Sequence, residues 1–173
     1  MFSNVNYTAP ESSSLKDSTR CAIIPAMIKE TYLAVKKKVV PSGDVVFDIS
    51  RFTKKKGNIS PLAPSQELLN EWNRDRIVWK DYVEKYYEEL RENEEANSLI
   101  QEIANRAARD DIWLVCLERG YPCHRFLVKE IIERILAARG VLEEPEDYSE
   151  YYRQCKNLTR SAIRTLCHVS SRS

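Results

Sequence analysis

The chain has 173 residues, of which 43% are hydrophobic and 31% are charged, a composition typical of a single globular domain. Lys and Arg number 27 and Asp and Glu number 26, so the formal net charge of +1 produces no field that would attract nucleic acid or an anionic membrane. The longest apolar run, Ile112–Leu117, is far shorter than the roughly 20 residues of a membrane-spanning helix. These values exclude a disordered chain and a transmembrane protein.

The first residues carry no sign of a secretory signal. The chain begins Met-Phe-Ser-Asn-Val-Asn-Tyr, without a basic start or an apolar core. The five cysteines are odd in number and widely spaced, which is unlike a disulfide framework. We therefore expect a cytoplasmic protein with reduced thiols.

Short apolar segments predict the strands. Two segments have the continuous apolar composition of buried strands, one more polar segment near the N-terminus is a further strand candidate, and two shorter runs are weaker candidates. In chain order, the expected strands are Ser3–Thr8, Asp44–Ile49 and Asp111–Leu117, and the weaker runs are Cys21–Ile24 and Val141–Leu142.

Amphipathic stripes, in which apolar residues recur three and four positions apart, predict the helices. One helix is expected after Pro25, where Ile28, Tyr32 and Val35 have helical spacing. A second has Ser65 as its N-terminal cap, and a helix that begins at Pro122 ends at Gly140. The remaining stripes predict helices over Trp79–Leu90, Ala96–Ala107 and Ser149–His168.

Strands that alternate with helices indicate an α/β fold. We expect a small, mainly parallel sheet flanked by helices, with an added C-terminal helix. The expected organisation is an α/β domain over residues 1–145, followed by an amphipathic helical extension over residues 146–173.

The ends of two predicted strands locate a candidate site, because ligands of parallel sheets bind beyond the carboxyl ends of the strands. After one strand, Glu118 precedes a turn, and Cys123 and His124 open the next helix. Helix starts bind anions and favour thiolates. We therefore expect Cys123 as a nucleophile, His124 as an acid or base, and Glu118 as the group that orients them.

Other polar residues at the two strand ends are candidates for ligand binding. Arg125 carries a fork of donors suited to phosphate or carboxylate. Asp48 and Arg51 follow the neighbouring strand and would complete a small polar pocket.

A metal site built from Cys116, Cys123 and His124 is an alternative. The spacing of these residues matches no usual zinc pattern, so we expect no metal. Cys116, which lies inside an apolar strand, also fits the role of a small buried hydrophobe.

Several ordered motifs resemble the family called domain of unknown function 488. They are Leu62-Ala-Pro-Ser65, the helix with Trp79-Lys-Asp-Tyr82, the strand ending in Cys116-Leu-Glu118, and Cys123-His-Arg125. The strand Val45–Arg51 is also similar to a strand of that family, and the resemblance covers roughly residues 44–142. The resemblance implies a bacterial or archaeal protein of a family with no settled activity, and it adds Cys116 and Ser65 to the expected binding residues.

Two classes of function fit these features. The first is an enzyme, a cysteine- and histidine-dependent hydrolase or transferase that acts on a small anionic or nucleotide-like molecule. The second is a binding module that contacts nucleic acid or a protein partner through basic residues of the last helix, namely Arg153, Lys156, Arg160 and Arg164. The same helix could instead form a homodimer. The residues identify neither a cofactor nor the substrate, and no membrane contact is expected.

Overall fold

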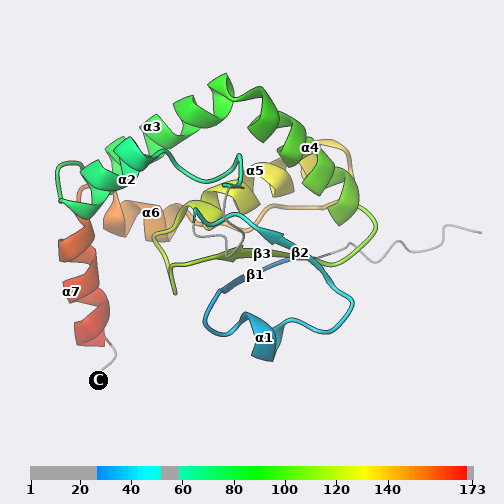
Figure 1. Cartoon of the computed structure of the whole chain (residues 1–173), viewed down its shortest axis with the longest axis horizontal. Coiled ribbons are helices and arrows are strands. Elements are labelled where there is room, and N and C mark those ends of the chain that lie inside the picture. The colour runs from blue at the N-terminus through cyan, green and yellow to red at the C-terminus, as the bar shows by residue number, and fades with distance from the viewer. Residues whose placement is uncertain (1–26, 52–58, 171–173) are drawn as a thin grey trace, which may run out of the picture.

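The computed structural model describes residues 27–51 and 59–170, with side chains through Thr165. A three-stranded parallel sheet lies at its centre, formed by β1 (Ile28–Tyr32), β2 (Val45–Asp48) and β3 (Ile112–Cys116) in the order β1-β3-β2 (Figure 1). Ile112 is aligned with Ile28 on one side and with Val45 on the other. All three strands therefore end at the same edge of the sheet.

The middle strand, β3, is apolar on both faces because it is covered on both. Leu114 and Val115 point to opposite faces, and both are completely buried. The continuous apolar run that predicted this strand is thus explained by its central place in the sheet. The predicted strand over residues 44–49 is also confirmed, as β2.

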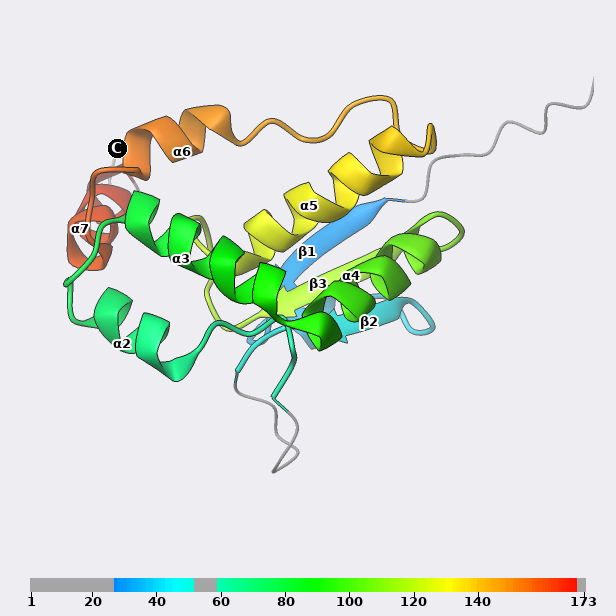
Figure 2. The same ribbon diagram turned by 90° about the horizontal axis from the view of Figure 1, so that it is seen from above.

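The helices pack against the sheet in the expected α/β arrangement. Figures 1 and 2 show α3, α4 and α5 on the same side of the strands, while Figure 1 shows the short α1 on the other side. The first five helices are α1 (Lys36–Val39), α2 (Gln66–Asn73), α3 (Trp79–Glu92), α4 (Glu94–Ala107) and α5 (His124–Ala138). They bury the apolar stripes seen in the sequence, including Trp79, Tyr86 and Ile103.

Two predicted helix ends are confirmed in atomic detail. The Ser65 hydroxyl accepts a hydrogen bond of 3.0 Å from the Leu68 N–H and caps α2. Gly140 follows α5 with a φ of +69°, a backbone conformation that glycine adopts without strain.

The helix predicted after Pro25 is wrong over residues 28–32, which form β1. The apolar spacing fits one turn of a helix, but Ile28 and Thr31 are β-branched and both become buried beside β3. Pairing with the central strand satisfies the backbone groups of this segment, and that pairing is a long-range contact that local spacing does not reveal. The expected elements at residues 3–8 and 21–24 lie outside the described residues.

The C-terminal region also differs from its prediction. Val141 and Leu142 are not a strand, and the single expected helix is divided into α6 (Ser149–Cys155) and α7 (Arg160–Ser170). At the break, the carbonyl of Leu158 accepts from the Trp79 N–H at 3.0 Å, and that of Lys156 accepts from the Lys80 N–H at 2.9 Å. The break thus satisfies N–H groups at the start of α3, where Val78 offers no side-chain cap.

In the part of the chain that the structure describes, no helix has the length and apolar character needed to cross a bilayer.

Candidate functional site

A small pocket lies at the carboxyl edge of the sheet, where β2 and β3 end and α5 begins. We call it the strand-end pocket. Its volume is about 110 Å³, and it brings together residues of the two strand ends, α2, α3, α5 and α7. The residues that line it are Ser50, Arg51, Pro64, Leu69, Trp72, Asn73, Trp79, Tyr82, Cys116, Leu117, Glu118, Pro122, Cys123, His124 and Arg160.

Two cysteines and a histidine form a buried cluster in this pocket. Cys116 is the last residue of β3, Cys123 is the N-cap of α5, and His124 is the first residue of that helix. The Nδ1 atom of His124 lies 3.9 Å from the Sγ atoms of both cysteines. Residues eight positions apart thus meet because β3 and α5 are joined by a turn that returns to the strand end.

The backbone directly after β2 orients the histidine. Nε2 of His124 lies 3.0 Å from the carbonyl oxygen of Ile49. A carbonyl can only accept, so Nε2 carries a proton, and Nδ1 is the ring nitrogen left to face Cys123. The ring of Tyr86 packs edge-on against the imidazole, with 5.6 Å between centroids. The histidine is therefore held in one orientation toward the cysteines.

The two thiols are electrostatically different. A hydrogen bond from Cys123 lowers the pKa of Cys116 against the opposing effect of burial, and His124 and the backbone N–H of Glu118 lower it further. Burial raises the pKa of Cys123, and the proximity of Cys116 raises it further. Of the pair, Cys116 is thus the thiol whose surroundings favour the thiolate, whereas the sequence had pointed to Cys123.

Two arginines and one carboxylate line the same pocket. Arg51 donates to the side chain of Gln66 and to the carbonyl of Pro64, each at 3.1 Å. Arg160 forms an ion pair of 2.7 Å with Glu118. Glu118 is therefore directed to an arginine of α7, not to His124, which it was expected to orient.

Arg125 does not line the pocket, although the sequence placed it among the ligand-binding residues. Its guanidinium is almost completely buried, pairs with Glu30 of β1 at 2.9 Å, and donates to the backbone carbonyls of Glu118 and Arg119. These contacts tie the turn before α5 to the edge of the sheet. Arg125 thus stabilises the turn that leads to the pocket residues at the start of α5.

Two more expected binding residues have local structural contacts. Asp48 accepts from the backbone N–H of Ser50 at 3.0 Å and from its hydroxyl at 2.6 Å, and so shapes the turn after β2. Ser65 caps α2, and its backbone N–H donates to Glu89. Neither lines the strand-end pocket.

Sequence reasoning missed Arg160 and three aromatic side chains as parts of the pocket. Trp72, Trp79 and Tyr82 are core residues, and each also lines the pocket as an aromatic wall. The rings of Trp79 and Tyr82 stack with centroids 4.9 Å apart. Arg160 was recognised only as part of a basic stripe, since its approach to the sheet depends on the break between α6 and α7.

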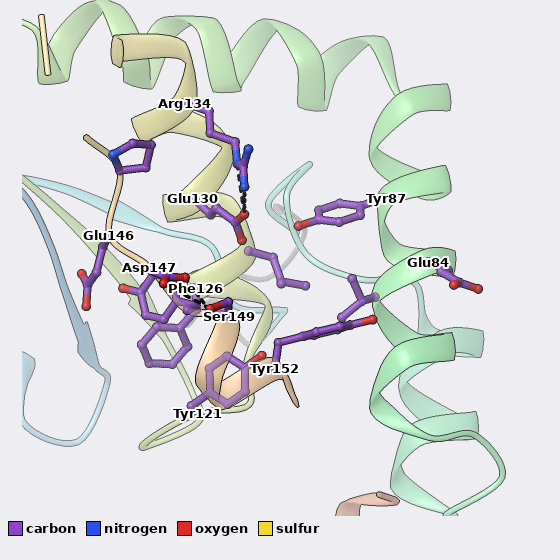
Figure 3. A pocket seen from close by; sticks show the side chains of 14 residues that line it. Glu84, Tyr87, Tyr121, Phe126, Glu130, Arg134, Glu146, Asp147, Ser149 and Tyr152 are labelled. Carbon is purple, nitrogen blue, oxygen red and sulfur yellow. Dashed lines mark hydrogen bonds and ion pairs between the residues drawn. The ribbon is translucent and has the colours of Figure 1, made fainter. Parts of the chain in front are cut away.

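A second and larger cavity, which we call the outer pocket, lies between α3, α5 and the segment before α6 (Figure 3). Its volume is about 600 Å³. Figure 3 shows tyrosine rings and carboxylates around it, with Arg134 bonded to Glu130. Among the described residues that line it, none is a cysteine or a histidine. This pocket therefore lacks the nucleophiles and soft metal ligands of the strand-end pocket.

Within the described residues, the groups that could hold a soft metal ion are Cys116, Cys123 and His124, whose ligand atoms lie within 4.8 Å of one another. The residue spacing had disfavoured a metal, but this spacing rule describes ligands on one local loop. Here the fold brings the ligands together.

Comparison with known proteins gives one result. No curated protein and no solved structure matches the chain. The model of DUF488-N3a, described as the active DUF488-N3 subclade, matches residues 30–136. The matched region is well over half of the chain and contains both strand ends and the Cys-Cys-His cluster, while α6 and α7 lie beyond it. The chain therefore belongs to the DUF488 family, as the motifs around Cys116 and Cys123 indicated.

Proposed function

We propose that the strand-end pocket binds a small anionic group, such as a phosphate or carboxylate, and presents it to the Cys-Cys-His cluster for hydrolysis or group transfer. The observation that carries this proposal is convergence: two guanidinium groups and three side chains capable of nucleophilic or acid-base chemistry line one pocket. Arg51 and Arg160 supply the positive charge, and Cys116, Cys123 and His124 supply the reactive atoms.

The size of the pocket restricts the ligand. A volume of about 110 Å³ is below the roughly 300 Å³ at which pockets for whole drug-sized ligands begin. A phosphate or carboxylate group fits, and the rest of a larger substrate would extend outward past the aromatic wall.

Alkylation with a charged and an uncharged reagent tests this proposal. The full chain is treated with a chelator and then with iodoacetate or iodoacetamide, and the modification of each cysteine is followed by mass spectrometry. We expect the iodoacetate-to-iodoacetamide rate ratio to be higher at Cys116 than at Cys155, a half-buried thiol outside the pocket. We also expect inorganic phosphate to protect Cys116. Because both reagents need the same access to a given cysteine, the ratio of their rates cancels the difference in accessibility between Cys116 and Cys155.

Substituting the two arginines separates charge from structure. Arg160→Met should lower the iodoacetate rate at Cys116 about tenfold, since one charged hydrogen bond contributes about 1.5 kcal/mol. The iodoacetamide rate should stay unchanged. The control is Arg134→Met, which removes an exposed arginine of the outer pocket. Equal rates with the two reagents in the wild type, without protection by phosphate, would refute an anion-binding pocket.

A further inference from the structure

The Cys-Cys-His cluster has the composition and proximity of a metal site. Two thiols and one imidazole, all buried, place their ligand atoms within 4.8 Å of one another. Among the divalent metal ions of cells, Zn²⁺ is the one that prefers a mixed set of thiolate and imidazole ligands. The ligands come from the end of β3 and the start of α5, two rigid elements.

The histidine is arranged as metal-ligating histidines are. Because Nε2 donates to the Ile49 carbonyl, Nδ1 is the ring nitrogen that can bind an ion, and Cys123 Sγ lies 3.9 Å from it. A ligating imidazole commonly donates its other N–H to a backbone carbonyl, which fixes the tautomer. The sulfur side has similar support, since Nη1 of Arg125 lies 3.9 Å from Cys123 Sγ and would offset thiolate charge.

The distances are close to those of a loaded site. In a tetrahedral zinc site with bonds of about 2.3 Å to sulfur and about 2.05 Å to nitrogen, sulfur and nitrogen lie about 3.6 Å apart. Cys123 Sγ is 3.9 Å from Nδ1, so this distance would contract by only about 0.3 Å on metal binding. Cys116 Sγ is 3.9 Å from Nδ1 but also 3.8 Å from Nε2, so its side chain would have to rotate toward the Nδ1 side of the ring.

We propose that Cys116, Cys123 and His124 bind a zinc-like ion through three protein ligands, with the fourth coordination position directed into the strand-end pocket. All three residues line that pocket, so a water molecule or a substrate oxygen could reach the ion. Structural zinc sites use four protein ligands, whereas three ligands and an open position are typical of catalytic sites. This inference deepens the proposed function by assigning the three side chains to an ion, which would then activate a bound water molecule or substrate oxygen in place of a cysteine nucleophile. It rests on the proposed function only for what occupies the fourth position.

Cobalt(II) binding tests the site without requiring activity. The full chain, purified under reducing conditions and cleared of metal with a chelator, is titrated with Co²⁺. We expect one equivalent to bind and to produce a thiolate-to-cobalt charge-transfer band together with the visible bands of a tetrahedral ion. Zn²⁺ should displace Co²⁺ and remove these bands. Elemental analysis of the untreated protein should show close to one metal ion per chain.

Matched variants locate the ligands. Cys116→Ser, Cys123→Ser and His124→Gln should each weaken Co²⁺ binding by more than about tenfold, since even the loss of an outer-shell contact costs 10–100-fold. The control variant, Cys155→Ser, changes a half-buried cysteine outside the cluster and should bind like the wild type. Circular dichroism verifies folding, and the wild-type spectrum remains decisive if a variant fails to fold.

The outcomes distinguish this inference from the proposed function. A folded wild-type chain that shows no cobalt bands overturns the metal site, as does an equal loss of binding in Cys155→Ser. If phosphate still protects Cys116 in that metal-free chain, the anion-binding pocket is supported and the metal site is not. If instead cobalt binds normally while phosphate neither protects Cys116 nor perturbs the cobalt spectrum, the metal site stands and the proposed function fails.

Discussion

The outer pocket is larger than the strand-end pocket, but the strand-end pocket is the one whose described lining includes cysteines and a histidine. The outer pocket is more than five times larger, about 600 Å³ against about 110 Å³. Its described lining consists mainly of tyrosines and carboxylates, whereas the smaller pocket holds two cysteines, a histidine and two arginines. The comparison shows that the cysteines and the histidine lie at the ends of the parallel strands and not in the larger pocket.

The physical reason lies in what builds each pocket. The outer pocket lies between helix sides, where long exposed side chains such as Glu84 and Arg134 surround an open space (Figure 3). The strand-end pocket is formed where two strands end and a helix starts, so backbone groups fix its side chains. The two pockets share a wall, because the indole N–H of Trp79 donates to the Tyr121 hydroxyl at 2.8 Å.

The largest expected difference concerns two arginines of α5. Arg125→Met should lower the free energy of unfolding by about 3 kcal/mol, because it leaves Glu30 and two backbone carbonyls without their buried partner. Arg134→Met, beside the outer pocket, should cost less than about 0.5 kcal/mol because that arginine is 70% exposed. Urea denaturation measures both. Similar losses for the two variants would remove the contrast between a rigid and a loose pocket.

A smaller difference is expected for two adjacent tyrosines of α3. The hydroxyl of buried Tyr86 donates to the Leu62 carbonyl at 2.7 Å, so Tyr86→Phe should cost about 1.5 kcal/mol. Tyr87 faces the outer pocket, and Tyr87→Phe should change the free energy of unfolding by less than about 0.5 kcal/mol. Thermal unfolding of both variants checks this. A larger loss for Tyr87→Phe would show that the outer pocket is the more tightly bonded region.

The smallest effect is the pH dependence of Glu146 in the outer pocket. Burial raises the pKa of Glu146, but the ion pair with Lys129 outweighs it and leaves the pKa below its ordinary value of 4.5. Its stabilising contribution is thus fully present above pH 4.5 and is lost as the pH falls through the lowered pKa.

Glu146→Gln should therefore lower the free energy of unfolding at pH 7 by no more than about 0.5 kcal/mol, since water screens the Glu146 carboxylate, whose side chain is 52% exposed. The difference from the wild type should shrink as the medium becomes acidic. Urea denaturation across that range measures it, and a difference that grows on acidification would contradict the assigned direction.

Local sequence features predicted most of the helices and the central strand. The stripes of α3 and α4 and the apolar run of β3 are local patterns, and each element forms within a few residues of its expected position. The strand-end rule also led to the edge where Cys116, Cys123 and His124 meet. Each of these inferences needed only nearby residues and a general property of parallel sheets.

The predictions that failed concern side chains whose partners are distant in the sequence. Because the apolar spacing predicts a helix over residues 28–32, it does not reveal Glu30 as the partner that pairs with Arg125. In the same way, the continuous C-terminal helix expected from the stripe concealed the approach of Arg160 to Glu118. Spacing along one segment indicates which face is apolar, but it does not reveal which distant group will pair with a charge.

The carbonyls between α6 and α7 that accept from Trp79 and Lys80 have a consequence for how the molecule can be divided. A chain cut after residue 145 would retain all three strands and α5, yet it would lose the acceptors at the first turn of α3 and the arginine facing Glu118 together. Trp79 lies at that junction and also lines the strand-end pocket. Removing the segment beyond residue 145 would therefore disturb the strand-end pocket before the sheet itself.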